Sequence, residues 1–149
     1  MTVRWLLAAV HLLALGIGLG SVWARARLLG APTLDGPTLR RALAADVWWG
    51  VAAILWVGSG LWRLLAGTEK TTAYYLQNHA FWAKMALFAT ILVLESTPIV
   101  RLGAWRRQLA KGETPDLSAA PGMARTSYVQ AVLVILMVLA ATAMARGLG

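Results

Sequence analysis

Four long apolar segments, separated by short polar connections, dominate the pattern along the chain. They cover residues 5–23, 47–66, 80–100 and 127–145. A helix needs about 20 mostly apolar residues to cross a bilayer, and each segment has close to that length. The connections between them are too short for a second domain. The pattern therefore predicts an all-α fold, an integral membrane four-helix bundle, with residues 1–149 forming a single transmembrane domain.

Composition and tryptophan placement support this prediction. Apolar residues make up 59% of the chain, charged residues 13%, and mean hydropathy is +0.65, a balance that a soluble domain of this size cannot hide in its core. Indole rings prefer the head-group layer, and all but one of the tryptophans lie near a predicted segment end. These are Trp5, Trp23, Trp48, Trp49, Trp62, Trp82 and Trp105. Only Trp56 lies in mid-segment.

The basic residues predict an orientation. The first and third connections carry Arg25, Arg27, Arg40, Arg41, Arg101, Arg106, Arg107, Lys111 and Arg125, whereas the second has Arg63 and Lys70 against Glu69. By the positive-inside rule the first and third loops are cytoplasmic and both termini lie outside. Because the positive charges cluster at the ends of apolar runs, the net charge of +8 indicates contact with the lipid bilayer rather than with nucleic acid. A cleaved signal peptide is the alternative for the first segment, but cleavage would require four downstream arginines to cross the membrane.

Local signals predict several helix ends. Asp35, followed by a glycine and a proline, reads as an N-cap, as does Asn78 before the third segment. Pro98 is expected to end or kink the third helix. Residues 101–111 are then expected to form a short interfacial helix, and residues 112–122 a flexible loop.

Three ionisable residues lie within the apolar segments, where burying a charge costs a few kcal/mol, so they are candidates for function. They are His11, Lys84 and Glu95. Lys84 and Glu95 are 11 residues apart, which places them on one face of the third helix. In the predicted orientation, four of the candidate residues lie toward the outer end: His11, Lys84, Arg63 and His79. Four others lie toward the inner end: Glu95, Asp46, Arg25 and Arg27.

Each of these residues also has a structural interpretation. His11 can be a neutral histidine that hydrogen-bonds across helices, Lys84 can extend to the head groups, and Glu95 can pair with an arginine. Glycines 16, 18, 20, 58 and 60 favour close helix packing, and they would also admit a flat ring. The chain has no cysteine, which excludes disulfides and thiolate metal sites.

Over nearly its whole length the chain resembles a family of short, uncharacterised four-helix membrane proteins of bacteria. Trp5, the stretch 11–27 and the stretch 74–84 carry this resemblance. It implies a location in the bacterial inner membrane.

More distantly the chain resembles the bacterial membrane protoporphyrinogen oxidases, which bind haem b. The shared residues are Trp5, His11, Arg27, Trp82 and Lys84. In those oxidases the first-helix histidine and the third-helix lysine are the functional pair, which here implies His11 and Lys84. Their further histidine, 11 positions after the lysine, is replaced by Glu95.

These observations lead to a functional hypothesis: a membrane redox protein that holds one haem b with His11 as the metal ligand. Imidazole suits iron, His79 is a second candidate ligand, and Lys84, Arg63 and Arg27 are candidates for binding carboxylates of the cofactor. If the protein is an enzyme, the resemblance implies tetrapyrrole oxidation, with Lys84 holding the substrate carboxylate and a quinone as electron partner. The candidate catalytic residues are then Lys84 and Glu95.

Two alternatives remain open. A proton or small-solute transport protein would use His11, Lys84, Glu95 and Asp46 as a polar track. A structural subunit of a membrane complex, or a homo-oligomer, would use its charges only for internal pairing.

Overall fold

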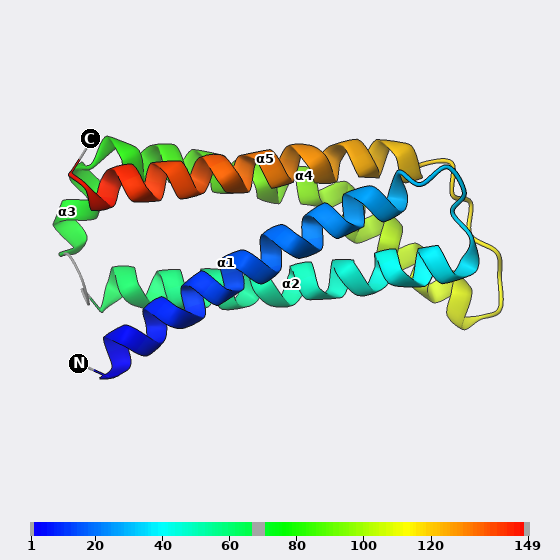
Figure 1. Cartoon of the computed structure of the whole chain (residues 1–149), viewed down its shortest axis with the longest axis horizontal. Helices are drawn as coiled ribbons and strands as arrows, with labels where there is room; N and C mark the ends of the chain where they lie inside the picture. The colour runs from blue at the N-terminus through cyan, green and yellow to red at the C-terminus, as the bar shows by residue number, and fades with distance from the viewer. Residues whose placement is uncertain (1, 67–70, 148–149) are drawn as a thin grey trace.

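The computed structural model describes residues 2–66 and 71–147, and within these ranges the secondary structure is helical with no strand. Five helices follow one another along the chain (Figure 1): α1 (Thr2–Leu29), α2 (Gly36–Leu65), α3 (Thr72–Gln77), α4 (His79–Ala110) and α5 (Ala120–Ala145). All but the short α3 are long and apolar enough to cross a membrane. The prediction of four apolar helices is therefore confirmed. The expected orientation across the membrane stays a prediction, and Glu69 and Lys70, which entered it, lie outside the described residues.

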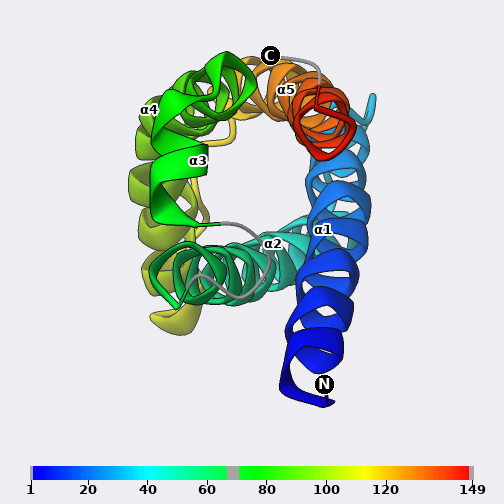
Figure 2. The ribbon, with the colours of Figure 1, turned by 90° about the vertical axis from the view of Figure 1, so that its left-hand side faces the viewer.

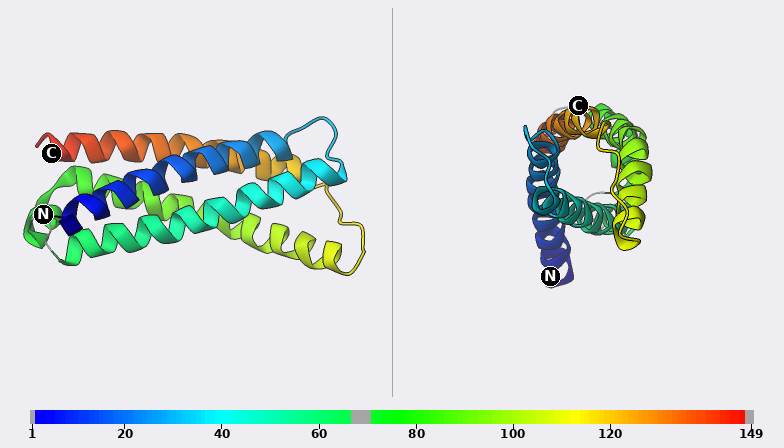
Figure 3. Two further views of the ribbon diagram at one scale, coloured as in Figure 1. Left: turned by 60° about the horizontal axis from the view of Figure 1, so that its bottom comes forward. Right: turned by 90° about the vertical axis from the view of Figure 1, so that its right-hand side faces the viewer.

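The four long helices surround a common axis, as Figure 2 shows from one end. Around the ring α5 lies between α1 and α4, and α1 lies between α5 and α2. Both termini and α3 lie at one end of the bundle, and the α1–α2 and α4–α5 connections lie at the other, which we call the connection end. Helix α1 crosses the bundle obliquely. Its C-terminal part lies beside α5, whereas its N-terminal end diverges toward and beyond α2 (Figure 3).

Side-chain caps set the beginning of two long helices. The Asp35 carboxylate accepts a hydrogen bond from the Thr38 backbone N–H at 2.8 Å, and the Asn78 amide oxygen accepts one from the Phe81 N–H at 3.1 Å. Each satisfies a backbone donor that has no partner inside the helix. Both predicted N-caps are confirmed.

Pro98 was expected to end or kink the third helix, and the first of these two outcomes is wrong. Helix α4 passes through this proline and continues to Ala110, so residues 101–110 extend a membrane helix instead of forming a separate interfacial one. An interior proline removes one backbone hydrogen bond and crowds the carbonyl one turn earlier, and the complete burial of the Pro98 side chain offsets this cost. The expected loop is also shorter than predicted, because α5 begins at Ala120. Helix α3 was not anticipated; its first turn is capped by Thr71, whose hydroxyl accepts from the Tyr74 N–H.

The bundle has two apolar clusters of buried residues. One lies in mid-bundle and includes Trp49, Ile91 and Val134. The other lies at the connection end, beyond the predicted apolar segments, and is formed by Leu29, Leu39, Ala42, Leu43, Leu102, Trp105, Ala120, Met123 and Ala124. Two connection residues, Leu34 and Leu117, pack against it. The long helices thus continue past their apolar segments into a packed end, and a polar network lies between the two clusters.

Candidate functional site

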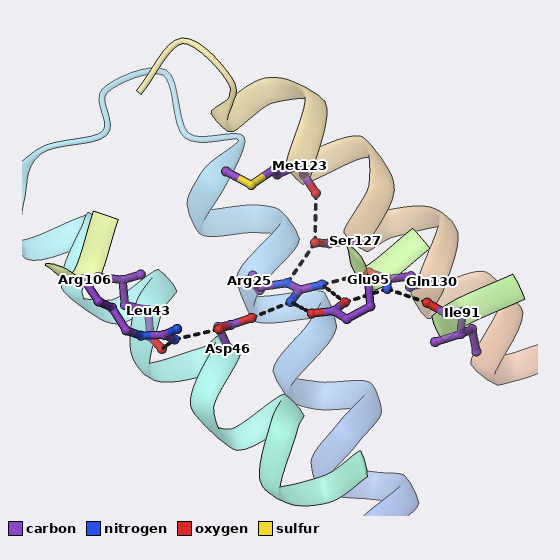
Figure 4. A network of polar contacts seen from close by, with 9 residues as sticks. All are labelled: Arg25, Leu43, Asp46, Ile91, Glu95, Arg106, Met123, Ser127 and Gln130. Atoms are coloured by element: carbon purple, nitrogen blue, oxygen red, sulfur yellow. Dashed lines mark hydrogen bonds and ion pairs between the residues drawn. The ribbon is translucent and has the colours of Figure 1, made fainter. Parts of the chain in front are cut away.

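Arg25 is the centre of this polar network, and none of its surface is exposed. Its guanidinium donates to both oxygens of Glu95, at 2.8 and 2.9 Å, and to Asp46 at 2.6 Å. It also donates to the Gln130 side-chain oxygen at 2.8 Å and to the Ser127 hydroxyl at 3.0 Å. Figure 4 shows that these partners come from α2, α4 and α5, so one side chain of α1 joins all four long helices.

The partners of Arg25 are themselves satisfied. Arg106 donates to the second Asp46 oxygen at 2.6 Å, and the Gln130 amide donates to Glu95 at 2.7 Å. Two guanidinium groups therefore face two carboxylates, and the charges balance. A fully paired buried network of this kind holds its members in one arrangement. We call Arg25, Asp46, Glu95, Arg106, Ser127 and Gln130 the Arg25 network.

The predicted grouping of Glu95 with Asp46 and Arg25 is confirmed, as is the interpretation of Glu95 as an arginine partner. Arg27 does not join them, because two residues along a helix turn a side chain by about 200°, and Arg27 is exposed. The sequence pattern did not group Arg106, Ser127 or Gln130 with these residues. Ser127 and Gln130 are three residues apart in an otherwise apolar segment, and this spacing was an available signal for a shared polar face.

His11 forms a second polar group between α1 and α2. Its Nδ1 lies 2.9 Å from the Ser59 hydroxyl, and its Nε2 accepts the Trp56 indole N–H at 2.9 Å. An indole N–H only donates, so Nε2 carries no proton and Nδ1 is the protonated nitrogen of a neutral ring. Nδ1 then donates to Ser59, whose hydroxyl donates to the Leu55 carbonyl at 2.7 Å. The interpretation of His11 as a neutral histidine bonded across helices accounts for this geometry.

In this arrangement neither ring nitrogen of His11 is available to bind an iron. A metal bound at Nε2 would need the lone pair that accepts the Trp56 N–H, and Nδ1 holds a proton. The other histidine, His79, is exposed at the start of α4. With the His11 nitrogens engaged by Trp56 and Ser59, the residues present do not fit a haem whose iron is held by His11.

Lys84 lies on the inward-facing stripe of α4. The buried residues of this helix are Phe81, Ile91, Glu95, Pro98, Leu102 and Trp105. From Ile91 onward they recur every three or four positions, and Lys84 precedes Ile91 by seven residues, about two helical turns. Lys84 is half-buried and, among the described residues, has no hydrogen-bond or ion-pair partner. The neighbouring charge is that of Arg63, which has the same sign.

Arg63 connects this pair to the His11 group. It follows Ser59 by four residues on α2, which places it on the same helix face, one turn further along. The structure therefore brings His11, Arg63 and Lys84 to one end of the bundle, the end that also holds the termini. The carboxylates of the described residues lie toward the connection end: Asp35, Asp46, Glu95, Glu113 and Asp116. Within the described residues, the charged side chains at the terminal end are all cationic.

Space near the His11 group is limited. A side-chain carbon added at Gly18 would lie 3.4 Å from Ala52 and 3.5 Å from Trp49, while one added at Gly16 or Gly20 would meet nothing within 4 Å. Of the three glycines of α1, only Gly18 thus serves close packing. The adjoining interior hollow, between Ala14 and Trp56, holds about 10 Å³, room for one water molecule. A larger hollow of about 310 Å³ lies on the opposite face of α2, around Leu61 and Trp62, away from Arg63.

The fold and these groups define a class: a helical membrane protein with four candidate spans, a charge-balanced network near one end and cationic side chains, Lys84 and Arg63, near the other. A family model described as "Predicted membrane protein (DUF2214)" matches residues 3–149. The chain belongs to this family, which confirms the resemblance to uncharacterised four-helix membrane proteins. No curated protein and no solved structure matches the chain.

Proposed function

We propose that this protein binds a carboxylate-bearing amphiphile within the membrane, and that Lys84 and Arg63 hold the carboxylate. The observation that carries the proposal is the position of Lys84: on the inward-facing stripe of α4, half-buried, without an acidic partner among the described residues and close to a second cation. A bound anion would offset the cost of holding the Lys84 charge at membrane depth.

The terminal end differs from the connection end in a way that favours a ligand there. Near Arg25 all four long helices come together, and the guanidinium is fully enclosed. Toward the termini, α1 diverges from α5 (Figure 3), so Lys84 is not enclosed by four helices as Arg25 is. An amphiphile that enters from the bilayer would reach Lys84 with its charged group while its apolar part stays among apolar side chains.

A tetrapyrrole is the candidate class of amphiphile. The support is the resemblance to protoporphyrinogen oxidases through Trp5, His11, Trp82 and Lys84, in which the histidine and the lysine are the functional pair. This step rests on analogy. Iron ligation is not part of the proposal, because the His11 Nε2 atom is engaged by Trp56, and oxidation with a quinone partner stays a prediction from the resemblance.

The transport hypothesis draws less support from the geometry. A polar track needs side chains that can exchange partners along its length, whereas Glu95 accepts two hydrogen bonds from Arg25 and one from Gln130. These contacts hold Glu95 in one arrangement with its neighbours.

Binding of protoporphyrin IX to the detergent-purified full chain tests the proposal, with its dimethyl ester as the uncharged counterpart. Replacing Lys84 by Gln removes the charge and keeps a side chain of similar length. We expect Lys84→Gln to weaken binding of the free acid roughly tenfold or more, the usual effect of losing a hydrogen bond to a charged group. Binding of the ester should change little.

Lys111→Gln is the matched control, because Lys111 is the exposed residue at the C-terminus of α4. It should bind the acid as the wild type does. The proposal is wrong if the wild type binds neither compound, if ester and acid bind equally well, or if both lysine variants behave alike.

A further inference from the structure

The seam between α1 and α5 carries an aromatic pair at the surface of the bundle. The rings of Trp23 and Tyr128 meet edge to face, with centroids 5.3 Å apart. Both rings remain partly exposed, at 48% for Trp23 and 38% for Tyr128. Amphipathic aromatic side chains in this position favour the head-group layer of a bilayer. The pair therefore marks the level at which the seam leaves the hydrocarbon core.

Two exposed arginines follow the aromatic pair toward the connection end. Arg27 comes four residues after Trp23, and Arg125 comes three residues before Tyr128 on a helix that runs in the opposite direction. Residues three or four apart share a helix face. Each arginine thus lies on the same face as its aromatic neighbour, about one helical turn further from the membrane centre.

Helices α1 and α5 are in contact just before and just after the level of these two arginines. Arg25 and Ser127 are joined at 3.0 Å, and a side-chain carbon added at Gly30 would lie 3.5 Å from that of Ala124. Arg27 lies between residues 25 and 30, and Arg125 between residues 124 and 127. The two helices are in contact above and below them, so the two guanidinium groups start from neighbouring backbones and can reach a common anion.

Within residues 2–66 and 71–147, no acidic side chain pairs with the two exposed arginines of this seam. Neither α1 nor α5 contains an aspartate or a glutamate. Among the described residues neither Arg27 nor Arg125 has a hydrogen-bond or ion-pair partner, whereas the neighbouring Arg25 is fully paired inside the bundle. Two guanidinium groups with free donors, placed beside aromatic rings at head-group level, match a phosphate linked to a glycerol and acyl chains.

We propose that Arg27, Arg125, Trp23 and Tyr128 form a binding site for an anionic phospholipid on the α1–α5 seam. The two arginines hold the phosphate, and the aromatic pair lies against the glycerol and the first carbons of the acyl chains. This site is separate from Lys84 and Arg63 and does not depend on the function proposed for them. It also does not depend on which face of the membrane the connection end occupies.

Native mass spectrometry of the full chain in detergent tests the site by counting bound phosphatidylglycerol against phosphatidylcholine. The test variant is Arg27→Gln with Arg125→Gln. Its matched control is Arg40→Gln with Arg41→Gln, which removes the same charge from two exposed positions on α2, away from the seam. Each cation near an anionic surface changes affinity about fivefold, so the seam variant should bind the first phosphatidylglycerol roughly 25-fold more weakly. The control should keep its affinity within about twofold, because neither of its arginines lies on the seam.

Thermal melting provides a second measurement and shows whether the variants fold. Without added lipid all three proteins should melt at the same temperature, because the four arginines are exposed. Added phosphatidylglycerol should raise the melting temperature of the wild type and the control but not of the seam variant. Arg27→Lys with Arg125→Lys should give an intermediate effect, since it keeps the charges and loses the two-pronged donors. Equal losses in the seam and control variants, or no loss in either, would overturn the proposal.

Discussion

Arg25 and Glu95, 70 residues apart in the sequence, form a two-pronged ion pair at 2.8 and 2.9 Å inside the bundle. Asp46 and Arg106 balance the remaining charges. Because the pair joins α1 to α4, which lie on opposite sides of α5 in the ring, it fixes the rotation and height of the two helices. A buried pair of this kind has its largest effect when one partner is removed alone.

We therefore expect Glu95→Ala to lower the free energy of unfolding by about 3–5 kcal/mol, because it leaves the Arg25 guanidinium buried without its main partner. Unfolding of the detergent-solubilised protein by increasing amounts of sodium dodecyl sulfate, followed by circular dichroism, measures the loss. Glu113→Ala is the control, because Glu113 is exposed in the α4–α5 connection.

A double variant distinguishes the effect of the two charges from the effect of the volume that the two side chains fill. Arg25→Met with Glu95→Met removes both charges and leaves Asp46 with Arg106, so it should be considerably more stable than Glu95→Ala. The two single variants, Arg25→Met and Glu95→Met, complete the comparison. If the double variant loses as much stability as these two lose together, the two residues do not act as a pair.

The sequence predicted some parts of this structure better than others, for physical reasons. Hydrophobic length alone identifies a membrane helix, and the caps at Asp35 and Asn78 depend only on neighbouring residues. The choice between Arg25 and Arg27 needs the rotation of α1. A spacing of three or four residues does connect Arg25 with His11, Ala14, Gly18, Val22 and Leu29. In a helix that is apolar on all sides, however, this stripe is hidden, because lipid and helix neighbours both favour apolar residues.

Long-range partners were the least predictable feature. The His11 bonds to Trp56 and Ser59 depend on the angle at which α1 crosses α2, which no local signal encodes. The continuation of α4 through Pro98 depends in the same way on tertiary packing, which outweighed the local effect of the proline.

The tautomer of His11 is a direct prediction of its two contacts. Nitrogen chemical shifts of the labelled histidine should show a neutral ring protonated at Nδ1, because the Trp56 N–H occupies Nε2. In Trp56→Phe that donor is absent, and the signal should move toward the form protonated at Nε2. His79, which is exposed, serves as the internal reference. A ring protonated at Nε2 in the wild type would contradict the arrangement.

The glycines of α1 offer a matched pair of substitutions. Gly18→Val should destabilise the protein by about 1–3 kcal/mol, the usual cost of overpacking a filled contact, since Ala52 and Trp49 lie within 3.5 Å of the new carbon. Gly16→Val makes the same chemical change on the same helix, where nothing lies within 4 Å, and should have little effect. Detergent unfolding compares the two variants, and equal stabilities would refute the close approach of α1 to α2 at Gly18.

The N-cap of α2 predicts a dependence of stability on pH. Hydrogen bonds from the side chain and backbone of Thr38 lower the pKa of Asp35 from its usual value of about 3.8. A carboxyl whose pKa is lower in the folded state stabilises the fold above its unfolded pKa and loses that contribution as the pH falls through the folded value. Asp35→Asn keeps a capping oxygen but does not titrate in this range. Melting temperatures measured across the acidic range should show the wild type more stable than Asp35→Asn at neutral pH, with the difference shrinking below the usual aspartate pKa. Other acidic groups, including Asp116, titrate in both proteins and cancel in the comparison, so a difference that stays constant with pH would exclude a charged cap at Asp35.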